Sequence, residues 1–201
     1  IVGEEMERFG VHLWLAPALN IHRSIRCGRN FEYYSEDPIL TGTLMAYQAR
    51  GLEENGVIAT YKHLIANNME FERKSAHGII DENTLRDLYL RVFDKAFSLY
   101  KPGCVMTSYN PVNGIYPCEN SALLNDLLRG EWGFDGFVMT DWGSYDTADS
   151  IRSVCAGTNL LTPGSKKHFR MILKAVKRNE ISKAALQHSV KQIVKVLVRC
   201  I

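Results

Sequence analysis

The stretch Gly136-Phe137-Val138-Met139-Thr140-Asp141-Trp142-Gly143 sets the pattern from which the fold is predicted. Its short apolar run after a glycine is typical of a buried strand. The run ends in Asp141, and burying a carboxylate at the end of a strand costs free energy unless polar groups face it. In α/β folds, ligands and catalytic groups lie at the carboxyl ends of the strands. Asp141 could equally cap the following helix, so the octapeptide alone leaves both alternatives open.

Apolar runs alternate with helical patterns along the rest of the chain. Besides residues 137–139, the expected strands cover residues 11–17, 56–61, 104–107 and, more weakly, 157–161. The expected helices cover residues 4–9, 38–56, 81–100, 121–129, 146–155, 167–179 and 183–200. This alternation predicts a parallel sheet with helical crossovers.

Two α/β architectures fit such a sheet: a partial TIM-type β/α barrel and an open doubly wound sheet. Polar residues follow nearly every expected strand, which favours the barrel because the loops of a barrel share one mouth. An eight-unit barrel typically needs about 250 residues. We therefore expect residues 1–201 to form a single domain, most of a barrel without its first strands. The open edge should be covered by missing parts of the same protein or by another chain.

The composition is that of an ordinary globular protein, with 46% apolar and 23% charged residues. The net charge of +2 and the lack of a long apolar run give no reason to expect binding to nucleic acid or insertion in a membrane. The five cysteines form no CxxC pair. Their odd number favours free thiols in a reducing compartment such as the cytoplasm, and argues against a zinc site. Because the chain starts at Ile1, a secretion signal could precede it.

Five segments should bring functional side chains to the shared mouth: Arg29, Lys62-His63, Arg73, Tyr109 and Asp141-Trp142. One carboxylate among cations, hydrogen-bond donors and aromatic rings suits a neutral, polyhydroxylated ligand. The cations would keep the carboxylate ionised, as a nucleophile must be. Glycoside hydrolysis needs such a carboxylate opposite a second group that protonates the leaving oxygen.

Each of these side chains also has an ordinary structural explanation. Lys62 and His63 could face solvent or be satisfied in the core, and the two arginines could lie on the surface. Tyr109 and Trp142 could be core aromatics with satisfied polar tips. Their place at successive strand ends favours one pocket, and the residues by themselves indicate a site for a polar small molecule.

Longer motifs run in order along the whole chain. They are LAPALNI (residues 15–21), CGRNFE (27–32), YSEDP (34–38), KH (62–63), NNME (67–70), VMTSYN (105–110), NG (113–114) and EWGFDGFVMTDW (131–142). Together they resemble glycoside hydrolase family 3. The resemblance implies a barrel domain and a retaining, exo-acting β-glycosidase that removes terminal non-reducing β-D-glucosyl residues. Its substrate would be a β-linked oligosaccharide or aryl glycoside, and no cofactor or metal is implied.

The matched motifs also imply roles for individual residues. Asp141 would be the nucleophile that forms the glycosyl-enzyme. Tyr109 would make a hydrogen bond near it, and Trp142 would line the sugar platform. The residues that would bind the hydroxyls of the terminal sugar are Arg29, Lys62, His63 and Arg73.

The chain departs from the family pattern in three places. It lacks the first barrel strands, including a segment that contributes an acidic sugar ligand. It also lacks the second domain, which carries the acid/base glutamate in β-glucosidases of the family. Residues 24–26 (SIR) replace a stretch where many relatives have a proline.

Other functions therefore stay open. They are a β-xylosidase or β-N-acetylhexosaminidase specificity, and a catalytically silent carbohydrate-binding or structural fragment. The hexosaminidases of the family use a His–Asp dyad on the loop after Lys-His. His77 lies on the matching loop, but its neighbours differ from that pattern, and we expect His77 on the surface.

Overall fold

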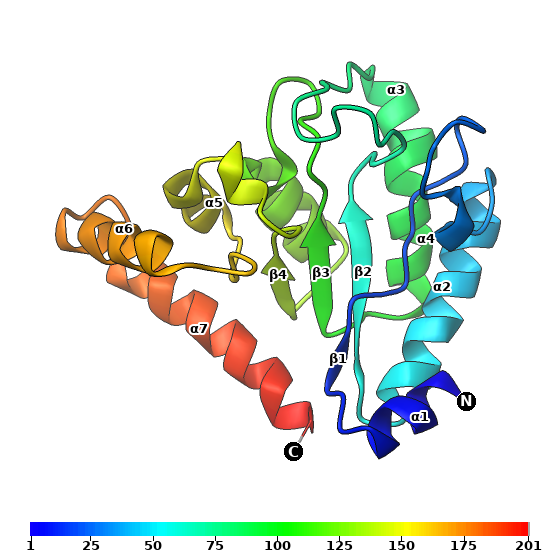
Figure 1. Cartoon of the computed structure of the whole chain (residues 1–201), viewed down its shortest axis with the longest axis horizontal. Coiled ribbons are helices and arrows are strands. Elements are labelled where there is room, and N and C mark those ends of the chain that lie inside the picture. The colour runs from blue at the N-terminus through cyan, green and yellow to red at the C-terminus, as the bar shows by residue number, and fades with distance from the viewer. Residues whose placement is uncertain (201) are drawn as a thin grey trace.

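A parallel sheet of four strands forms the centre of the computed structural model, which describes residues 1–200 (Figure 1). The strands are β1 (Leu13–Trp14), β2 (Ile58–Leu64), β3 (Cys104–Thr107) and β4 (Phe137–Met139). Their spatial order follows the chain, β1-β2-β3-β4, and each neighbouring pair is parallel. A doubly wound sheet reverses its order at a switch point, whereas this sheet grows in one direction. It is part of a β/α barrel, as predicted.

The helices connect the strands and continue beyond the last one. The α-helices are α1 (Val2–Arg8), α2 (Pro38–Glu53), α3 (Glu82–Thr84), α4 (Arg91–Leu99), α5 (Ser150–Ala156), α6 (Lys166–Lys177) and α7 (Lys183–Leu197). The segments η2 (Leu85–Leu90) and η4 (Ala122–Glu131) are π-helical. Short 3-10 turns are η1 (Asn30–Glu32), η3 (Pro117–Glu119), η5 (Ser144–Asp146) and η6 (Val198–Cys200). The expected helix over residues 81–100 is thus continuous but changes its winding along its length.

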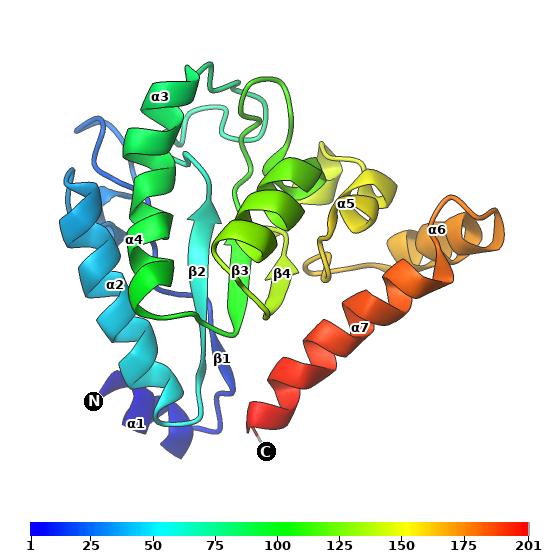
Figure 2. The same ribbon diagram turned by 180° about the vertical axis from the view of Figure 1, so that it is seen from behind.

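Helices α2 and α4 lie side by side on one face of the sheet (Figure 2). Side chains that point to this face, such as Tyr61, Val105 and Val138, join the core that these helices share with η4. Alternate residues of a strand point to opposite faces. Cys104 and Phe137 accordingly belong to a second cluster, which Val196 of α7 closes near the starts of the strands. Helices α2 and α4 therefore cover the outside of the barrel, and α7 packs near the amino ends of the strands.

Of the expected strands, one is shorter than predicted and another does not form a regular strand. The expected strand over residues 11–17 has regular pairing over Leu13–Trp14, and Pro17 has no N–H to extend a ladder. The expected strand over residues 157–161 is wrong as a regular strand, and forms a single parallel bridge between Met139 and Leu160. The reason is that the Oδ1 of Asn159 accepts the N–H of Val138 at 2.7 Å, where a ladder bond would lie.

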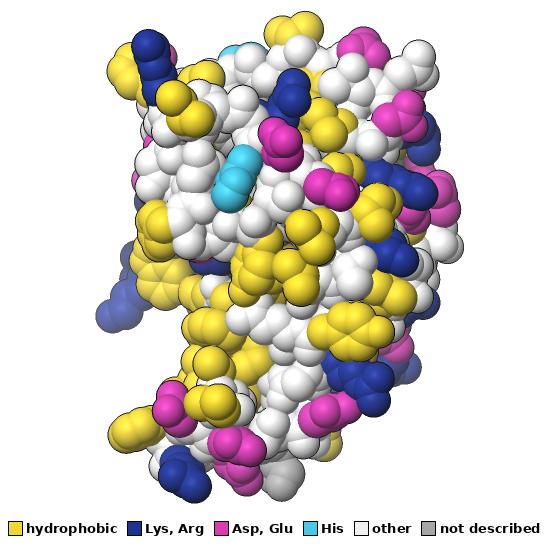
Figure 3. Space-filling view, turned by 90° about the vertical axis from the view of Figure 1, so that its right-hand side faces the viewer, with side chains coloured by type: hydrophobic (Ala, Val, Ile, Leu, Met, Phe, Trp, Pro, Cys, Tyr) yellow, Lys and Arg dark blue, Asp and Glu magenta, His cyan; other side chains and the backbone are white. Residues whose placement is uncertain are grey.

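The surface beside β1 carries the predicted open edge. Within residues 1–200, β1 pairs with β2 and its other side is unpaired. Apolar side chains gather on this side of the molecule (Figure 3), and α2 exposes Ile39, Leu40, Leu44 and Tyr47. No helix among the described residues is long and apolar enough to cross a membrane. Cys27, Cys104, Cys118 and Cys155 are free thiols, as predicted, and the side chain of Cys200 lies outside the description.

Candidate active site

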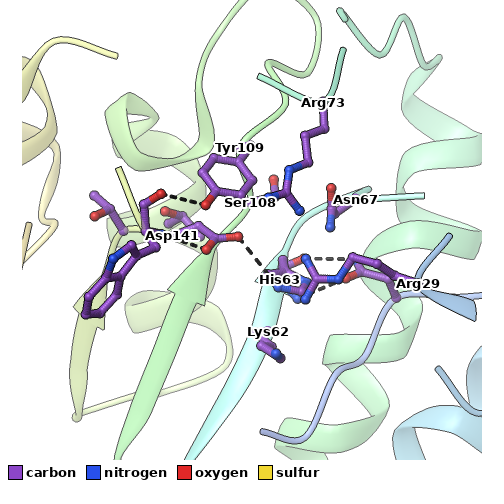
Figure 4. Close-up of polar contacts among 12 residues, drawn as sticks. Arg29, Lys62, His63, Asn67, Arg73, Ser108, Tyr109 and Asp141 are labelled. Atoms are coloured by element: carbon purple, nitrogen blue, oxygen red, sulfur yellow. Dashed lines mark hydrogen bonds and ion pairs between the residues drawn. The ribbon is translucent and has the colours of Figure 1, made fainter. Parts of the chain in front are cut away.

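The loops at the carboxyl ends of the strands bring the predicted side chains to one mouth (Figure 4). Arg29 lies on the loop after β1, Lys62 and His63 in β2, Arg73 on the loop after β2, Tyr109 on the loop after β3, and Asp141 and Trp142 after β4. They come from four strand ends. Some of them contact one another directly, and others share a carboxylate as their partner.

Asp141 is mostly buried, with 10% of its side chain exposed. Its Oδ1 accepts the backbone N–H of Trp142 at 2.6 Å. Its Oδ2 has no hydrogen-bond partner within residues 1–200 and lies 3.6 Å from the Nε2 of His63. The side chain is not the N-cap of the next α-helix, because Asp149 caps α5. One carboxylate oxygen is thus fixed and the other is free to meet a ligand.

His63 is a fully buried imidazole, and only 1% of its side chain is exposed. Its Nδ1 lies 3.0 Å from the Oδ1 of Asn20. Burial, reinforced by the positive charges of Arg29, Lys62 and Arg73, holds the pKa of His63 well below its ordinary value. The ring is therefore neutral.

Two glutamates that the sequence analysis did not single out neutralise the cations of the site. Glu32 makes a close ion pair with Arg29 and lies 3.1 Å from the Nζ of Lys62. Glu70 accepts a 2.7 Å hydrogen bond from the Nη1 of Arg73. The sequence pattern that could have identified both is their spacing of three residues from an arginine. In a tight turn, this spacing brings the two opposite charges close enough to form an ion pair.

Tyr109 is a hydrogen-bond donor at the centre of the mouth. Its hydroxyl donates to the backbone oxygen of Trp142 at 2.6 Å. The guanidinium carbon of Arg73 lies 4.6 Å from the centroid of its ring, in a cation–π arrangement. Burial, together with the charge of Asp141, raises the pKa of Tyr109 to about 12. Its hydroxyl therefore stays protonated at neutral pH.

Lys74 is a further residue that the sequence analysis missed. Its Nζ donates to the backbone oxygen of Gly143 at 3.3 Å and to the Oδ2 of Asp146 at 2.9 Å. These bonds tie the loop after β2 to the turn that follows Asp141. No local pattern marks such a contact, because the partners are about 70 residues apart in the sequence.

The two remaining predicted positions lie on the surface. Trp142 is 57% exposed, so its ring offers an apolar face at the mouth. His77 is exposed, as predicted, and lines a hollow together with Arg73. The site thus combines a free carboxylate oxygen, a neutral imidazole, three neutralised cations and an open aromatic face. This combination suits a neutral ligand with several hydroxyl groups.

A family model described as "Glycosyl hydrolase family 3 N terminal domain" matches residues 1–196 of this chain. The chain belongs to glycosyl hydrolase family 3. Thermostable beta-glucosidase B from Acetivibrio thermocellus is 42% identical over 197 residues, which cover 98% of this chain and 26% of that relative. Beta-glucosidase from Rhizobium radiobacter is 42% identical over 200 residues, which cover 98% of this chain and 24% of that relative.

A family 3 structure has nearly the same fold as this chain. Beta-glucosidase 3B from Thermotoga neapolitana, in complex with glycerol, matches with a TM-score of 0.94 at 43% identity, over 98% of this chain and 28% of that one. This likeness confirms the family resemblance drawn from the motifs and the partial barrel. The family 3 chain spans about a quarter of the length of the curated relatives it matches.

Proposed function

We propose that this chain carries the nucleophile and the sugar-binding groups of a retaining, exo-acting β-glycosidase of the β-glucosidase type. The observation that carries the proposal is the carboxylate of Asp141. Its Oδ1 is held by the N–H of Trp142, and its buried Oδ2 has no hydrogen-bond partner within residues 1–200. A nucleophile needs a fixed position and a free lone pair.

The reaction is a double displacement at the anomeric carbon of a terminal β-D-glucosyl residue. The Oδ2 of Asp141 forms a bond to the anomeric carbon while the bond from that carbon to the leaving oxygen breaks. A general acid gives the leaving oxygen its proton. A water molecule then attacks the same carbon, loses its proton to the conjugate base and releases Asp141. Two inversions restore the β-configuration, and no cofactor takes part.

The surrounding groups bind the sugar in this proposal. Arg29, Lys62 and Arg73 donate hydrogen bonds to its hydroxyls, and Trp142 covers its apolar side. Named relatives support this reading, since they are beta-glucosidases, and one solved structure is beta-glucosidase 3B from Thermotoga neapolitana in complex with glucose. We place the general acid in a second domain outside residues 1–201. Other segments of the same protein, or another chain, cover the open edge at β1.

A mechanism-based label tests the nucleophile without the acid. A 2-fluoro β-glucosyl donor with a highly activated leaving group needs little help from an acid, and its fluorine slows hydrolysis of the adduct. We expect one adduct per chain by intact mass spectrometry, mapped to Asp141 by peptide sequencing. Asp141→Asn is the control and should stay unlabelled. An adduct on another residue would contradict the assignment.

The second candidate function is a carbohydrate-binding fragment without turnover. The observation that favours it is that Glu32 and Glu70, the two glutamates beside the site, are both held in ion pairs with cations, so neither is poised to protonate a leaving oxygen. Adduct formation separates the two functions, on a chain that circular dichroism shows to be folded and that binds glucose. A folded chain that binds glucose but forms no adduct would support the fragment, and a stoichiometric adduct on Asp141 would exclude it.

A further inference from the structure

Asn20 lies on the loop after β1, and its buried side-chain amide contacts His63. It is 3% exposed. Its Nδ2 donates to the backbone oxygen of His63 at 2.9 Å, and its Oδ1 accepts the backbone N–H of His63 at 3.0 Å. The same Oδ1 lies 3.0 Å from the Nδ1 of the His63 ring. One amide therefore contacts both the backbone and the ring of His63.

The backbone of His63 fixes which way the amide of Asn20 points. A peptide N–H can only donate a hydrogen bond, and a peptide oxygen can only accept one. Turning the amide by 180° would place the NH₂ group against an N–H and the amide oxygen against a carbonyl oxygen. That arrangement loses two buried hydrogen bonds. The Oδ1 of Asn20 is therefore the atom that faces the imidazole.

This orientation in turn fixes the tautomer of His63. The amide oxygen is an acceptor only, so the Nδ1 of His63 must carry the hydrogen. A neutral imidazole has one N–H, and the ring is neutral because burial and the charges of Arg29, Lys62 and Arg73 oppose protonation. The carboxylate of Asp141, 3.6 Å from Nε2, acts in the opposite direction but does not outweigh them. The Nε2 of His63 is then a bare acceptor that points toward the mouth.

We propose that Asn20 is a positioning residue that holds His63 as the neutral Nδ1–H tautomer, so that Nε2 accepts a hydrogen bond from a ligand hydroxyl beside Asp141. The identity of that ligand as a sugar rests on the proposed function. Nε2 lies 3.6 Å from the Oδ2 of Asp141, which is beyond hydrogen-bond distance. Two buried acceptors thus face each other without a donor.

A ligand hydroxyl supplies what these two acceptors lack. An O–H between them donates to one acceptor and removes the cost of leaving it unpaired in a buried site. An ether or a carbonyl oxygen at the same place offers no hydrogen and adds a third acceptor. The arrangement therefore selects a hydroxyl at this position of the ligand, and His63 acts as an acceptor and not as an acid.

Nitrogen NMR on the chain labelled with ¹⁵N in its imidazole rings tests the tautomer directly. The chain has six histidines, and the His63→Gln spectrum identifies the His63 signals by their loss. We expect a protonated Nδ1 and a bare Nε2 that do not change between about pH 5.5 and pH 8, around the ordinary histidine pKa. A protonated Nε2, or an imidazolium near neutral pH, would overturn the proposal.

An isosteric variant tests the contribution of Asn20. Asn20→Asp places a carboxylate against Nδ1 and should convert His63 to an imidazolium in the same pH range. The matched control is Asn68→Asp, which adds a carboxylate on the loop after β2. Asn68 donates to the backbone oxygen of Ile21, and within residues 1–200 no hydrogen bond joins it to His63. An unchanged His63 spectrum in Asn20→Asp would overturn the positioning by Asn20, whereas the control should keep the neutral tautomer.

Glucose titration tests the second half of the proposal and separates it from the proposed function. The tautomer is read without sugar, so a wrong tautomer refutes the inference even if the chain binds glucose. With the tautomer as expected, bound glucose should move the Nε2 signal toward the hydrogen-bonded range. Binding without that movement would overturn the hydroxyl contact alone, whereas absence of binding would overturn both the contact and the proposed function.

Discussion

The hydroxyl of Tyr109 and the backbone oxygen of Trp142 are joined by a 2.6 Å hydrogen bond. This bond links the loop after β3 to the turn after β4. The N–H of the same Trp142 holds the Oδ1 of Asp141, and the Nζ of Lys74 donates to the backbone oxygen of Gly143, the next residue of the turn. The position of the Asp141 carboxylate therefore depends on three loops that meet at the mouth.

Removing the Tyr109 hydroxyl should slow chemistry at Asp141 without unfolding the chain. A neutral hydrogen bond contributes about 0.5–1.5 kcal/mol, so we expect Tyr109→Phe to slow labelling by the 2-fluoro donor about twofold to tenfold. Intact mass spectrometry of samples quenched at successive times gives the rate of labelling. The matched control is Tyr116→Phe, whose hydroxyl donates to the backbone oxygen of Lys74 at 3.2 Å. Equal slowing in both variants would contradict a specific contribution of Tyr109.

Glu32 should position the cations that bind the sugar, because it contacts both Arg29 and Lys62. In Glu32→Gln the two cations lose their shared charged partner, and their donors are no longer held toward the mouth. Hydrogen bonds to charged groups contribute about 1.5–3 kcal/mol, so glucose affinity should fall about tenfold or more, as measured by calorimetric titration. Glu36→Gln, at an exposed position, is the control and should bind glucose normally. Unchanged affinity in Glu32→Gln would exclude this positioning.

The buried, neutral His63 should make stability depend on pH. Its folded pKa is well below its ordinary value, whereas the unfolded chain takes up this proton near pH 6.5, so below about pH 6.5 the unfolded state binds more protons. The free energy of unfolding should therefore fall as the pH drops, by up to about 1.4 kcal/mol per pH unit from this group. Above about pH 6.5, His63 is neutral in both the folded and the unfolded state, so this group no longer makes the free energy of unfolding depend on pH.

Urea unfolding at several pH values measures this slope. The slope of His63→Gln should be smaller than that of the wild type, whatever its absolute stability, because the group that titrates is gone. The matched control is His77→Gln, which removes a histidine from an exposed position, and its slope is measured beside that of His63→Gln. A wild-type slope in His63→Gln would mean that His63 titrates alike in both states.

Replacing either of two glycines in α2 with alanine should change the stability of the chain, in opposite directions at the two positions. A Cβ on Gly42 would lie 2.5 Å from the backbone oxygen of Val92, where α2 and α4 cross closely, so Gly42→Ala should destabilise the chain by about 1–3 kcal/mol. A Cβ on Gly51 would meet nothing within 4 Å. Gly51→Ala should therefore stabilise the chain by about 0.5–1 kcal/mol through the unfolded state. Urea unfolding of both variants checks the opposite signs.

Much of the architecture was predictable because it arises from local patterns. Apolar runs and turn residues located β2, β3 and β4, and Asp37 before Pro38 marked the start of α2, where it caps the helix. The pattern failed at residues 157–161, where the side chain of Asn159 replaces a ladder bond of the neighbouring strand. Such a substitution depends on a partner about 20 residues away, and no local alternation records it.

Local sequence patterns were enough to predict the strand–helix alternation, the position of Asp141 at a strand end and the family to which the chain belongs. Which groups meet at the mouth depends on the tertiary structure. Asn20 and His63 are 43 residues apart, yet their contact fixes an amide orientation and a ring tautomer. The physical reason is that backbone propensities act between near neighbours, whereas hydrogen-bond partners and burial depend on how separate loops converge in space.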